Sequence, residues 1–213
     1  MRHIGQQTLP QIRHQWHIFT IENARNFHRK SENDALKDYV TISIDISKLK
    51  TCKIYESDFW YKRLFAHCML WFVYLDIHGE EHEIIFSIEA RRPQWQEYVL
   101  WKWIVPGMYS IIYVRWNPSD LLALRKHVRH DPLVSHELVL SNKEIQDLFK
   151  YFAHKTNKIH NRQIPYHAIR YNCITDLHRW LAHCSKKLFS LTIRTIFPKW
   201  YISYLQRNWL IKK

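Results

Sequence analysis

The segment YNCITDLHRW, residues 171–180, places a cysteine at the point where a loop is expected to turn into a helix. Asn172 is a good helix N-cap, and Asp176 falls in the first turn, where a carboxylate suits the helix dipole. Apolar residues follow at helical spacing: Ile174, Leu177 and Leu181. Backbone N–H groups at a helix start favour the thiolate, which is the nucleophilic form of cysteine. Cys173 is therefore a candidate nucleophile, and the alternative is a small buried side chain that happens to begin a helix.

A cysteine nucleophile needs a base within hydrogen-bond reach and a third group that holds the base. His67 is the candidate base because it begins a long apolar strand, where a polar imidazole needs a partner. Glu89 interrupts the apolar run FSIEARR, and the hairpin register would set Glu89 or Arg91 near His67. Pairs of His67 with Glu89, or of Glu89 with Arg91 or Arg92, are both consistent with the pattern. A purely structural ion pair at a strand end is the alternative.

Alternating and continuous apolar segments predict the strands that position these groups. Residues 40–46 alternate apolar with polar side chains, and residues 52–55 supply a second extended piece. Residues 67–75 and 83–91 predict a hairpin around Gly79. Further strands are expected over residues 101–106 and 109–116, whereas residues 1–38 are polar and basic and predict a loop with a short helix.

Helical patterns dominate the second half of the chain. Residues 119–127 predict a short amphipathic helix, and residues 141–157 predict a longer one that begins with a capping box of Ser141 and Glu144. The Cys173 helix follows, and Pro198 divides an aromatic, basic tail that covers residues 188–213. These elements predict one α+β domain in which an antiparallel sheet packs against helices.

Composition limits the class of protein more than it defines the function. The chain has 213 residues, of which 46% are hydrophobic and 15% aromatic, so a globular domain with a substantial core is expected. The formal charge of +13 favours polyanions, which means nucleic acid or an anionic membrane surface. The four cysteines form no CxxC pair, so we expect free thiols and neither a disulfide framework nor a zinc ribbon.

No signal peptide or membrane-spanning segment is expected from the sequence. The N-terminal residues MRHIGQQTLPQIRHQWHIF are broken by charge and lack an apolar signal core, and no run of 18 apolar residues occurs. These observations alone predict a soluble chain that stays in the compartment where it is made, and they do not exclude the cytoplasm.

Several long segments resemble the Lnb N-terminal periplasmic domain family. The resemblance is carried by AHCMLWFVYLDIHGEEHEIIFSIEARR, by YSIIYVRWNPSDLLALRKHVRHD, by PYHAIRYNCITDL and by the closing FPKWYISYLQRNWLI. It extends from about Asn23 to the C-terminus, which divides the chain into an N-terminal extension, residues 1–22, and a single catalytic domain, residues 23–213. The most specific pieces are A-H before a strand, S-I-E-A-R-R after the hairpin and N-C-I-T at a helix start.

The resemblance implies a circularly permuted papain-like thiol fold, in which the histidine strand comes first and the cysteine helix last. His67 would be the base, Glu89 the group that orients it and Cys173 the nucleophile, with Arg91, Tyr166 and Asn172 in supporting or substrate-binding roles. The implied function is cysteine-dependent acyl transfer or hydrolysis through a thioester, of the lipoprotein N-acyltransferase type. The implied partners are an acyl-chain donor and an amine or water acceptor, with no cofactor and no metal. The implied location is the periplasm or a membrane surface.

Two other functions are alternatives to an acyl-transfer enzyme. A non-enzymatic module could bind nucleic acid or an anionic membrane through the charge and tryptophans such as Trp95, Trp101, Trp103, Trp116 and Trp200. No nucleic-acid motif is present, so a nucleic-acid partner is not expected, whereas the aromatic, basic tail could dock peripherally on lipid. A metal site built from Cys173, His178, His183 and Cys184 does not have the usual spacing of zinc ligands.

Overall fold

A computed structural model describes residues 6–31, 34–58, 66–91, 109–116, 118–161, 164–167, 171–185 and 197–212. Its N-terminal half consists of strands: β1 (Gln11–Gln15), β2 (Ile18–Arg25), β3 (His28–Arg29), β4 (Ala35–Leu36), β5 (Tyr39–Asp45), β6 (Leu49–Asp58), β7 (Ala66–Leu75) and β8 (Glu81–Arg91), with a short 3-10 helix at Ile46–Lys48. The remainder comprises β9 (Ser110–Trp116), α2 (Pro118–Leu122), a π-helical continuation (Ala123–Val128), β10 (Leu133–Glu137), α3 (Asn142–Asn161), α4 (Thr175–Ser185) and α5 (Pro198–Arg207).

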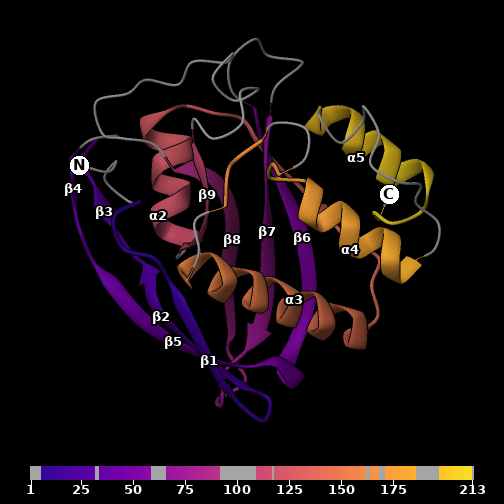
Figure 1. The fold of residues 1–213 in the computed structure, drawn as a ribbon, viewed down its shortest axis with the longest axis horizontal. Coiled ribbons are helices and arrows are strands. Elements are labelled where there is room, and N and C mark those ends of the chain that lie inside the picture. The colour runs from indigo at the N-terminus through magenta and orange to yellow at the C-terminus, as the bar shows by residue number, and fades with distance from the viewer. Residues whose placement is uncertain are drawn as a thin grey trace.

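One large sheet organises the chain. Its strand order is β1-β2-β9-β8-β7-β6-β10, with β5 paired to β2 off this path. Neighbouring strands are antiparallel except β2 and β9, which meet in parallel through one pair, Arg25 and Trp116. The predicted α+β class with an antiparallel sheet packed against helices is therefore confirmed (Figure 1).

Both faces of the sheet are covered by apolar side chains. Along β7, Cys68, Leu70 and Phe72 belong to the larger cluster, which also contains buried residues of α3, α4 and α5. Met69, Trp71 and Val73 belong to a second cluster with Leu121 and Leu124, from α2 and its π-helical continuation. Because side chains alternate across a strand, the two clusters lie on opposite faces of the sheet.

The predicted hairpin is confirmed, and a single glycine makes its turn. β7 and β8 pair from Leu75 and Glu81 to Met69 and Ser87, and Gly79 has a φ of 83°. Asp76 closes the turn by accepting hydrogen bonds from the backbone N–H groups of His78 and Glu80. A β-carbon at Gly79 would meet nothing within 4 Å, so the requirement for glycine there comes from backbone conformation rather than from space.

The helices agree with their predicted starts. α3 begins with the expected capping box, because Glu144 accepts from the backbone N–H and hydroxyl of Ser141 while the Glu144 N–H points to the Ser141 oxygen. The short helix expected over residues 119–127 exists, but its second half is a π-helix. α5 begins at Pro198, where the tail was expected to break.

The N-terminal prediction was wrong. Residues 11–25, expected as a loop with a short helix, form β1 and β2 and contribute Ile12, Phe19 and Ile21 to the core. The boundary predicted after residue 22 falls inside β2. Polar side chains on the outer face of this hairpin, such as Arg13 and Gln15, conceal its strand character in the sequence. The strand expected over residues 101–106 lies outside the described residues, as do Trp95, Trp101 and Trp103.

The aromatic tail packs as part of the core over its described length. Tyr201, Ile202 and Leu205 are buried, and the exposed aromatic side chains of this segment are Trp200 and Trp209. Over residues 197–212, most of the large apolar side chains therefore face the core.

Phe149 of α3 is the aromatic centre of the larger cluster, so we expect Phe149→Ala to lower the free energy of unfolding by about 3–5 kcal/mol. Its ring meets those of Phe19, Phe72 and Phe86 at centroid distances of 5.5, 5.3 and 5.2 Å. Urea denaturation would measure the change, with Ile77→Ala, at a side chain that is 85% exposed, as the matched control. A loss at Phe149 no larger than at Ile77 would contradict this assignment.

Candidate active site

The turn that carries Cys173 is fixed by Asn172. The Asn172 Oδ1 atom accepts from the backbone N–H groups of Ile174 and Thr175 at 2.9 and 3.0 Å. In return the Asn172 N–H donates to the Thr175 hydroxyl at 3.0 Å, which itself donates to the Asn172 carbonyl. Asn172 is thus the N-cap that the sequence predicts, and Cys173 sits in the capping turn immediately before α4.

Asp176 fixes the start of α4 against two other elements. This carboxylate is only 3% exposed and accepts hydrogen bonds from Tyr113 of β9, from Lys155 of α3 at 3.2 Å and from Arg179 at 3.0 Å. Buried charges need partners, and here they come from the sheet, from a neighbouring helix and from α4 itself. The orientation of the Cys173 turn is therefore set by the sheet and by α3.

The pairing between β7 and β8 ends next to this turn. The ladder of β7 and β8 ends at Met69 and Ser87. On the outer sides, pairing continues to Ala66 between β6 and β7, and to Arg91 between β8 and β9. The last residues of β8 and the first residues of β7, which include His67, are therefore not paired with each other. The backbone of Cys68 hydrogen bonds to the sulfur of Cys173, which places the thiol beside the end of this ladder.

His67 is held by a serine that the sequence analysis did not identify. The His67 Nε2 atom lies 2.7 Å from the Ser87 hydroxyl, and that hydroxyl donates to Glu89 Oε1 at 3.1 Å. Because Ser87 has one proton and gives it to the carboxylate, His67 must donate through Nε2–H. The neutral imidazole then carries its acceptor lone pair on Nδ1, which is the atom needed by a general base.

Glu89 is held in turn by Gln6. The Gln6 amide donates to Glu89 Oε2 at 3.3 Å and to the Ala90 carbonyl at 3.1 Å, and its side chain is buried. Burial raises the pKa of Glu89, but His67, Arg25, Arg125 and this hydrogen bond outweigh it, so the pKa is lowered overall. Glu89 is therefore an anion at the end of a His67–Ser87–Glu89 chain.

The thiol and the imidazole are both uncharged at neutral pH. Burial, with help from the positive charges of Arg125 and Arg129, lowers the pKa of His67 to about 3. Burial raises the pKa of Cys173 to about 11, although hydrogen bonds from the backbone and the charge of Arg125 act in the opposite direction. The low thiol pKa expected from the helix start is thus wrong, because desolvation of a thiolate costs more than the helix start gains.

A buried cation lies on the same side of the sheet as His67. Ser57 is paired across the strands with His67, and its hydroxyl donates to Asp131 at 3.5 Å. Asp131 accepts from Arg125 at 3.0 Å, and Arg125 is only 5% exposed. Neither Arg125 nor Asp131 was singled out from the sequence, where both fall in an unremarkable basic stretch.

The predicted site residues are brought to one region, but not all into contact. His67 and Glu89 share the Ser87 bridge, and no hydrogen bond joins His67 to Cys173 in this conformation of the described residues. By strand alternation His67 faces the second cluster, whereas Cys173 packs against the larger one on the other face.

The three supporting residues have structural contacts. Arg91 donates to the backbone carbonyls of Gln6 and Gln7 at 3.0 and 3.2 Å, so it anchors the segment that supplies Gln6. The Tyr166 side chain is buried in the larger cluster, and its N–H bonds to the Tyr109 carbonyl. Arg92, the other partner considered for Glu89, lies outside the described residues.

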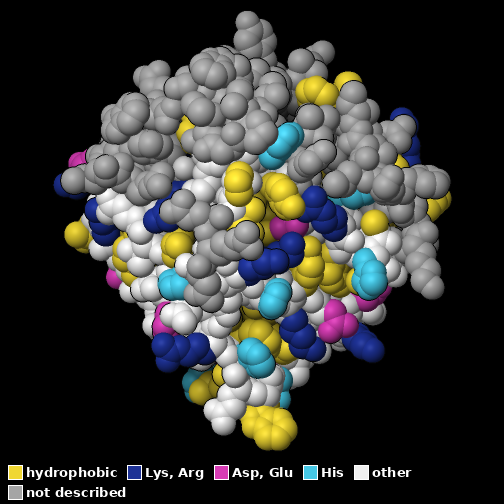
Figure 2. Space-filling model, in the orientation of Figure 1, with side chains coloured by type: hydrophobic (Ala, Val, Ile, Leu, Met, Phe, Trp, Pro, Cys, Tyr) yellow, Lys and Arg dark blue, Asp and Glu magenta, His cyan; other side chains and the backbone are white. Residues whose placement is uncertain are grey.

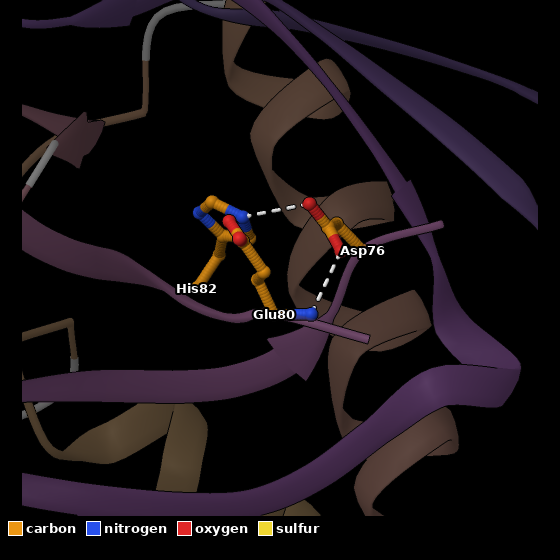
Figure 3. Close-up of side chains that lie close together, drawn as sticks. All are labelled: Asp76, Glu80 and His82. Atoms are coloured by element: carbon orange, nitrogen blue, oxygen red, sulfur yellow. Dashed lines mark hydrogen bonds and ion pairs between the residues drawn. The ribbon is translucent and has the colours of Figure 1, made fainter. Parts of the chain in front are cut away.

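The far end of the hairpin carries a different group of polar side chains (Figure 3). Asp76, Glu80 and His82 place ligand atoms within 4.8 Å of one another, but Asp76 Oδ1 already accepts from two backbone N–H groups and its Oδ2 lies 3.1 Å from His82. An open cleft of about 520 Å³ next to it is lined by Val40, Ile42, Tyr74, Glu81, His82 and Glu83. Both features sit at the turn end of β7 and β8, away from His67. The metal site weighed around Cys173 is also disfavoured, because His178 is buried with its ring against Tyr201 and Tyr204.

The lowered pKa of His67 predicts a specific loss of stability in mild acid. The unfolded chain protonates this histidine below its ordinary value of 6.5, whereas the folded chain does not until about 3. The unfolded state therefore binds more protons in this window, and the free energy of unfolding falls as the pH decreases. Urea denaturation from pH 7.5 to 5 should show a slope that is steeper for the wild type than for His67→Gln, by at most about 1.4 kcal/mol per pH unit. Parallel curves would contradict the uncharged His67.

Comparison with known proteins gives one match. A sequence model of the Lnb N-terminal periplasmic domain family covers residues 35–199, a range that includes His67, Glu89, Tyr166 and Cys173. No curated protein and no solved structure matches the chain. Among the described residues, no helix has the length and apolar character needed to cross a membrane. On this match over most of its length, the chain belongs to the Lnb N-terminal periplasmic domain family.

Proposed function

We propose that the protein is a thiol acyltransferase or hydrolase in which Cys173 is the nucleophile and His67 the general base. Membership in a periplasmic domain family points to the periplasm or the cell envelope as its place of action. The observation that carries the proposal is the bonding of His67, whose Nε2–H donates to Ser87, itself bonded to Glu89, so that Nδ1 of the neutral ring carries the acceptor lone pair; the backbone of the next residue, Cys68, hydrogen bonds to the sulfur of Cys173. Glu89 then orients the base through Ser87 rather than by direct contact.

The order of the site along the chain supports a circularly permuted papain-like arrangement. The base strand comes first, the orienting strand second and the nucleophile helix last. In such a site a hydrogen bond to one ring nitrogen fixes the orientation of the imidazole, and the other nitrogen receives the thiol proton. In this protein the two nitrogens of His67 would have the same roles, with Ser87 inserted between His67 and the carboxylate of Glu89.

Each step of the reaction can be written with the residues of this chain. His67 Nδ1 takes the proton from the Cys173 thiol, and the sulfur attacks an acyl carbonyl. Collapse of the tetrahedral adduct breaks the bond to the leaving group, which receives the proton from His67 and leaves a thioester on Cys173. Nδ1 then takes a proton from an amine or water, which attacks the thioester and releases the thiol.

The starting state differs from a preformed ion pair. A thiol with a pKa of about 11 beside an imidazole with a pKa of about 3 remains neutral, so proton transfer must accompany attack. The thiol and the ring must also move towards each other, because they pack against different faces of the sheet. Catalytic hydrogen bonds are often long in the absence of substrate and shorten when it binds.

A binding function receives less support. In Figure 2, Lys and Arg side chains on the described part of the visible face are scattered among acidic and apolar ones rather than gathered in one stripe. Of the five tryptophans expected to stack on bases, Trp200 is exposed, and the other four side chains lie outside those that the structure describes. Peripheral contact with lipid through Trp200 and Trp209 remains compatible with the enzyme.

The decisive test is to trap the thioester. The protein would be incubated with p-nitrophenyl acetate, and peptide mass spectrometry would locate the acetyl group and its lability to hydroxylamine. We expect acetylation of Cys173, its absence in Cys173→Ala and a rate at least about 100-fold lower in His67→Gln, because general-base assistance typically contributes that much. Cys184→Ala removes the exposed cysteine and should leave the adduct unchanged. Equal acetylation of Cys173 and Cys184, or no effect of His67→Gln, would overturn the proposal.

A further inference from the structure

The first residues of β8 have a strand on one side only. β8 begins at Glu81 and pairs with β7 from that residue onwards. On its other side β8 pairs with β9 only from Ile85, which is the partner of Trp116 at the end of β9. That edge of residues 81–84 therefore has no strand beside it in the part of the chain that the structure describes. The unpaired N–H and C=O groups of such an edge are a template for another extended segment.

The cleft of about 520 Å³ at the hairpin turn is lined by the same part of β8, residues 81–83. Asn26 and Pro118 also line it, and they follow closely after the residues through which β2 and β9 pair. Val40 and Ile42 of β5 form another wall. Among the described strands β5 pairs with β2 alone, so two strands that border the cleft each have an open edge.

Strand alternation gives the two faces of this edge different chemistry. Glu81 and Glu83 project to one face of β8, whereas His82 projects to the other. Tyr74, the strand partner of His82, is buried in the larger cluster, and its ring centroid lies 5.7 Å from that of His82. The β5 side chains that line the cleft pack against the same cluster. One face is therefore largely apolar, and the other carries two carboxylates.

The hairpin is the acidic part of a basic chain. Four acidic residues fall within residues 76–83, and neither Lys nor Arg occurs over residues 64–90, although the whole chain has 32 Lys and Arg against 19 Asp and Glu. Glu81 and Glu83 form no ion pair within the described part of the chain. Their charges are complementary to a basic ligand, which the rest of this protein would repel.

We propose that the cleft binds an extended segment of a partner protein, which adds to the open edge of residues 81–84 as a further strand. Alternate side chains of that segment would be apolar, against the face of Tyr74, and basic, against Glu81 and Glu83. A second copy of the chain is a poorer occupant, because pairing of this edge with itself would set carboxylates opposite one another. The cleft lies at the turn end of β7 and β8, so this binding does not depend on the proposed thiol chemistry.

A fluorescein-labelled peptide of alternating lysine and valine is the probe, and fluorescence anisotropy at about 0.15 M salt measures its affinity. One control peptide has the same composition with all lysines before the valines, and another has glutamate in place of lysine. We expect the block peptide to bind at least about tenfold more weakly, because only alternation places each kind of side chain on its own face. Equal binding of the block peptide, or tighter binding of the acidic one to this chain of charge +13, would overturn the proposal.

Removal of the two carboxylates should weaken the alternating peptide selectively. Glu81→Gln/Glu83→Gln is expected to lower its affinity by about tenfold, the effect of two partly exposed ion pairs. The matched control Glu137→Gln/Asp147→Asn removes the same charge from β10 and α3 and should leave the affinity unchanged. An equal loss in both double variants, or none in the first, would contradict a site at β8.

Amide hydrogen exchange locates the added strand directly. The peptide should slow exchange over residues 81–84, because N–H groups on the open edge become hydrogen-bonded. Protection of β10, which also ends the sheet, in place of residues 81–84 would overturn the assignment. Sedimentation in the absence of peptide tests the other occupant, since a dimer that the peptide dissociates would assign this edge to a second copy of the chain and against a basic partner.

Discussion

The buried carboxylate of Asp176 is the interaction on which the candidate site depends most. It joins the start of α4 to Tyr113 of β9 and to Lys155 of α3. A carboxylate that is 3% exposed cannot be left unpaired without a large cost, so these contacts hold the start of α4 against both elements. The position of Cys173 relative to the sheet follows from this, because Asn172 and Thr175 fix the turn to the same helix start.

A second constraint is the early end of pairing between β7 and β8. A continuous ladder would separate the two faces of the sheet completely, with Cys173 on one side and His67 on the other. Strand pairing ends at Met69 and Ser87, so His67 and Glu89 lie just beyond the ladder. Ser87 sits at the last paired position and connects the ring to Glu89 just where the ladder stops.

The sequence predicted the structure best where one residue type determines the backbone geometry of a few neighbouring residues. The Asn172 cap, the Ser141 and Glu144 capping box and the glycine turn at Gly79 depend on backbone geometry within a few residues, and all three were predicted correctly. The His67–Glu89 neighbourhood was also predicted, because hairpin register follows from the turn. These features need no knowledge of tertiary packing.

Features that depend on tertiary contacts were missed. Ser87 was missed because a serine inside an apolar strand is informative only once its neighbours on the same face are known. The available signal was its position two residues before Glu89, which places both side chains on the same face of the strand. The raised pKa of Cys173 was missed because burial competes with the helix start, and burial is a property of the whole fold. β1 and β2 were missed because one face of the hairpin is polar while the other supplies Ile12, Phe19 and Ile21 to the core. The burial of Arg125 beside Asp131 has no local signature in the sequence.

The protonated state of Cys173 has a consequence for its reaction with oxidants. Oxidants and disulfides react with thiolates, and a thiol whose pKa is about 11 holds almost none of its population in that form at neutral pH. Cys52 and Cys68 are protected in another way, because both are buried in the core. The desolvation that keeps the Cys173 thiol protonated therefore also makes it resistant to sulfenic acid formation and to mixed disulfides, whether or not it is the nucleophile that we propose.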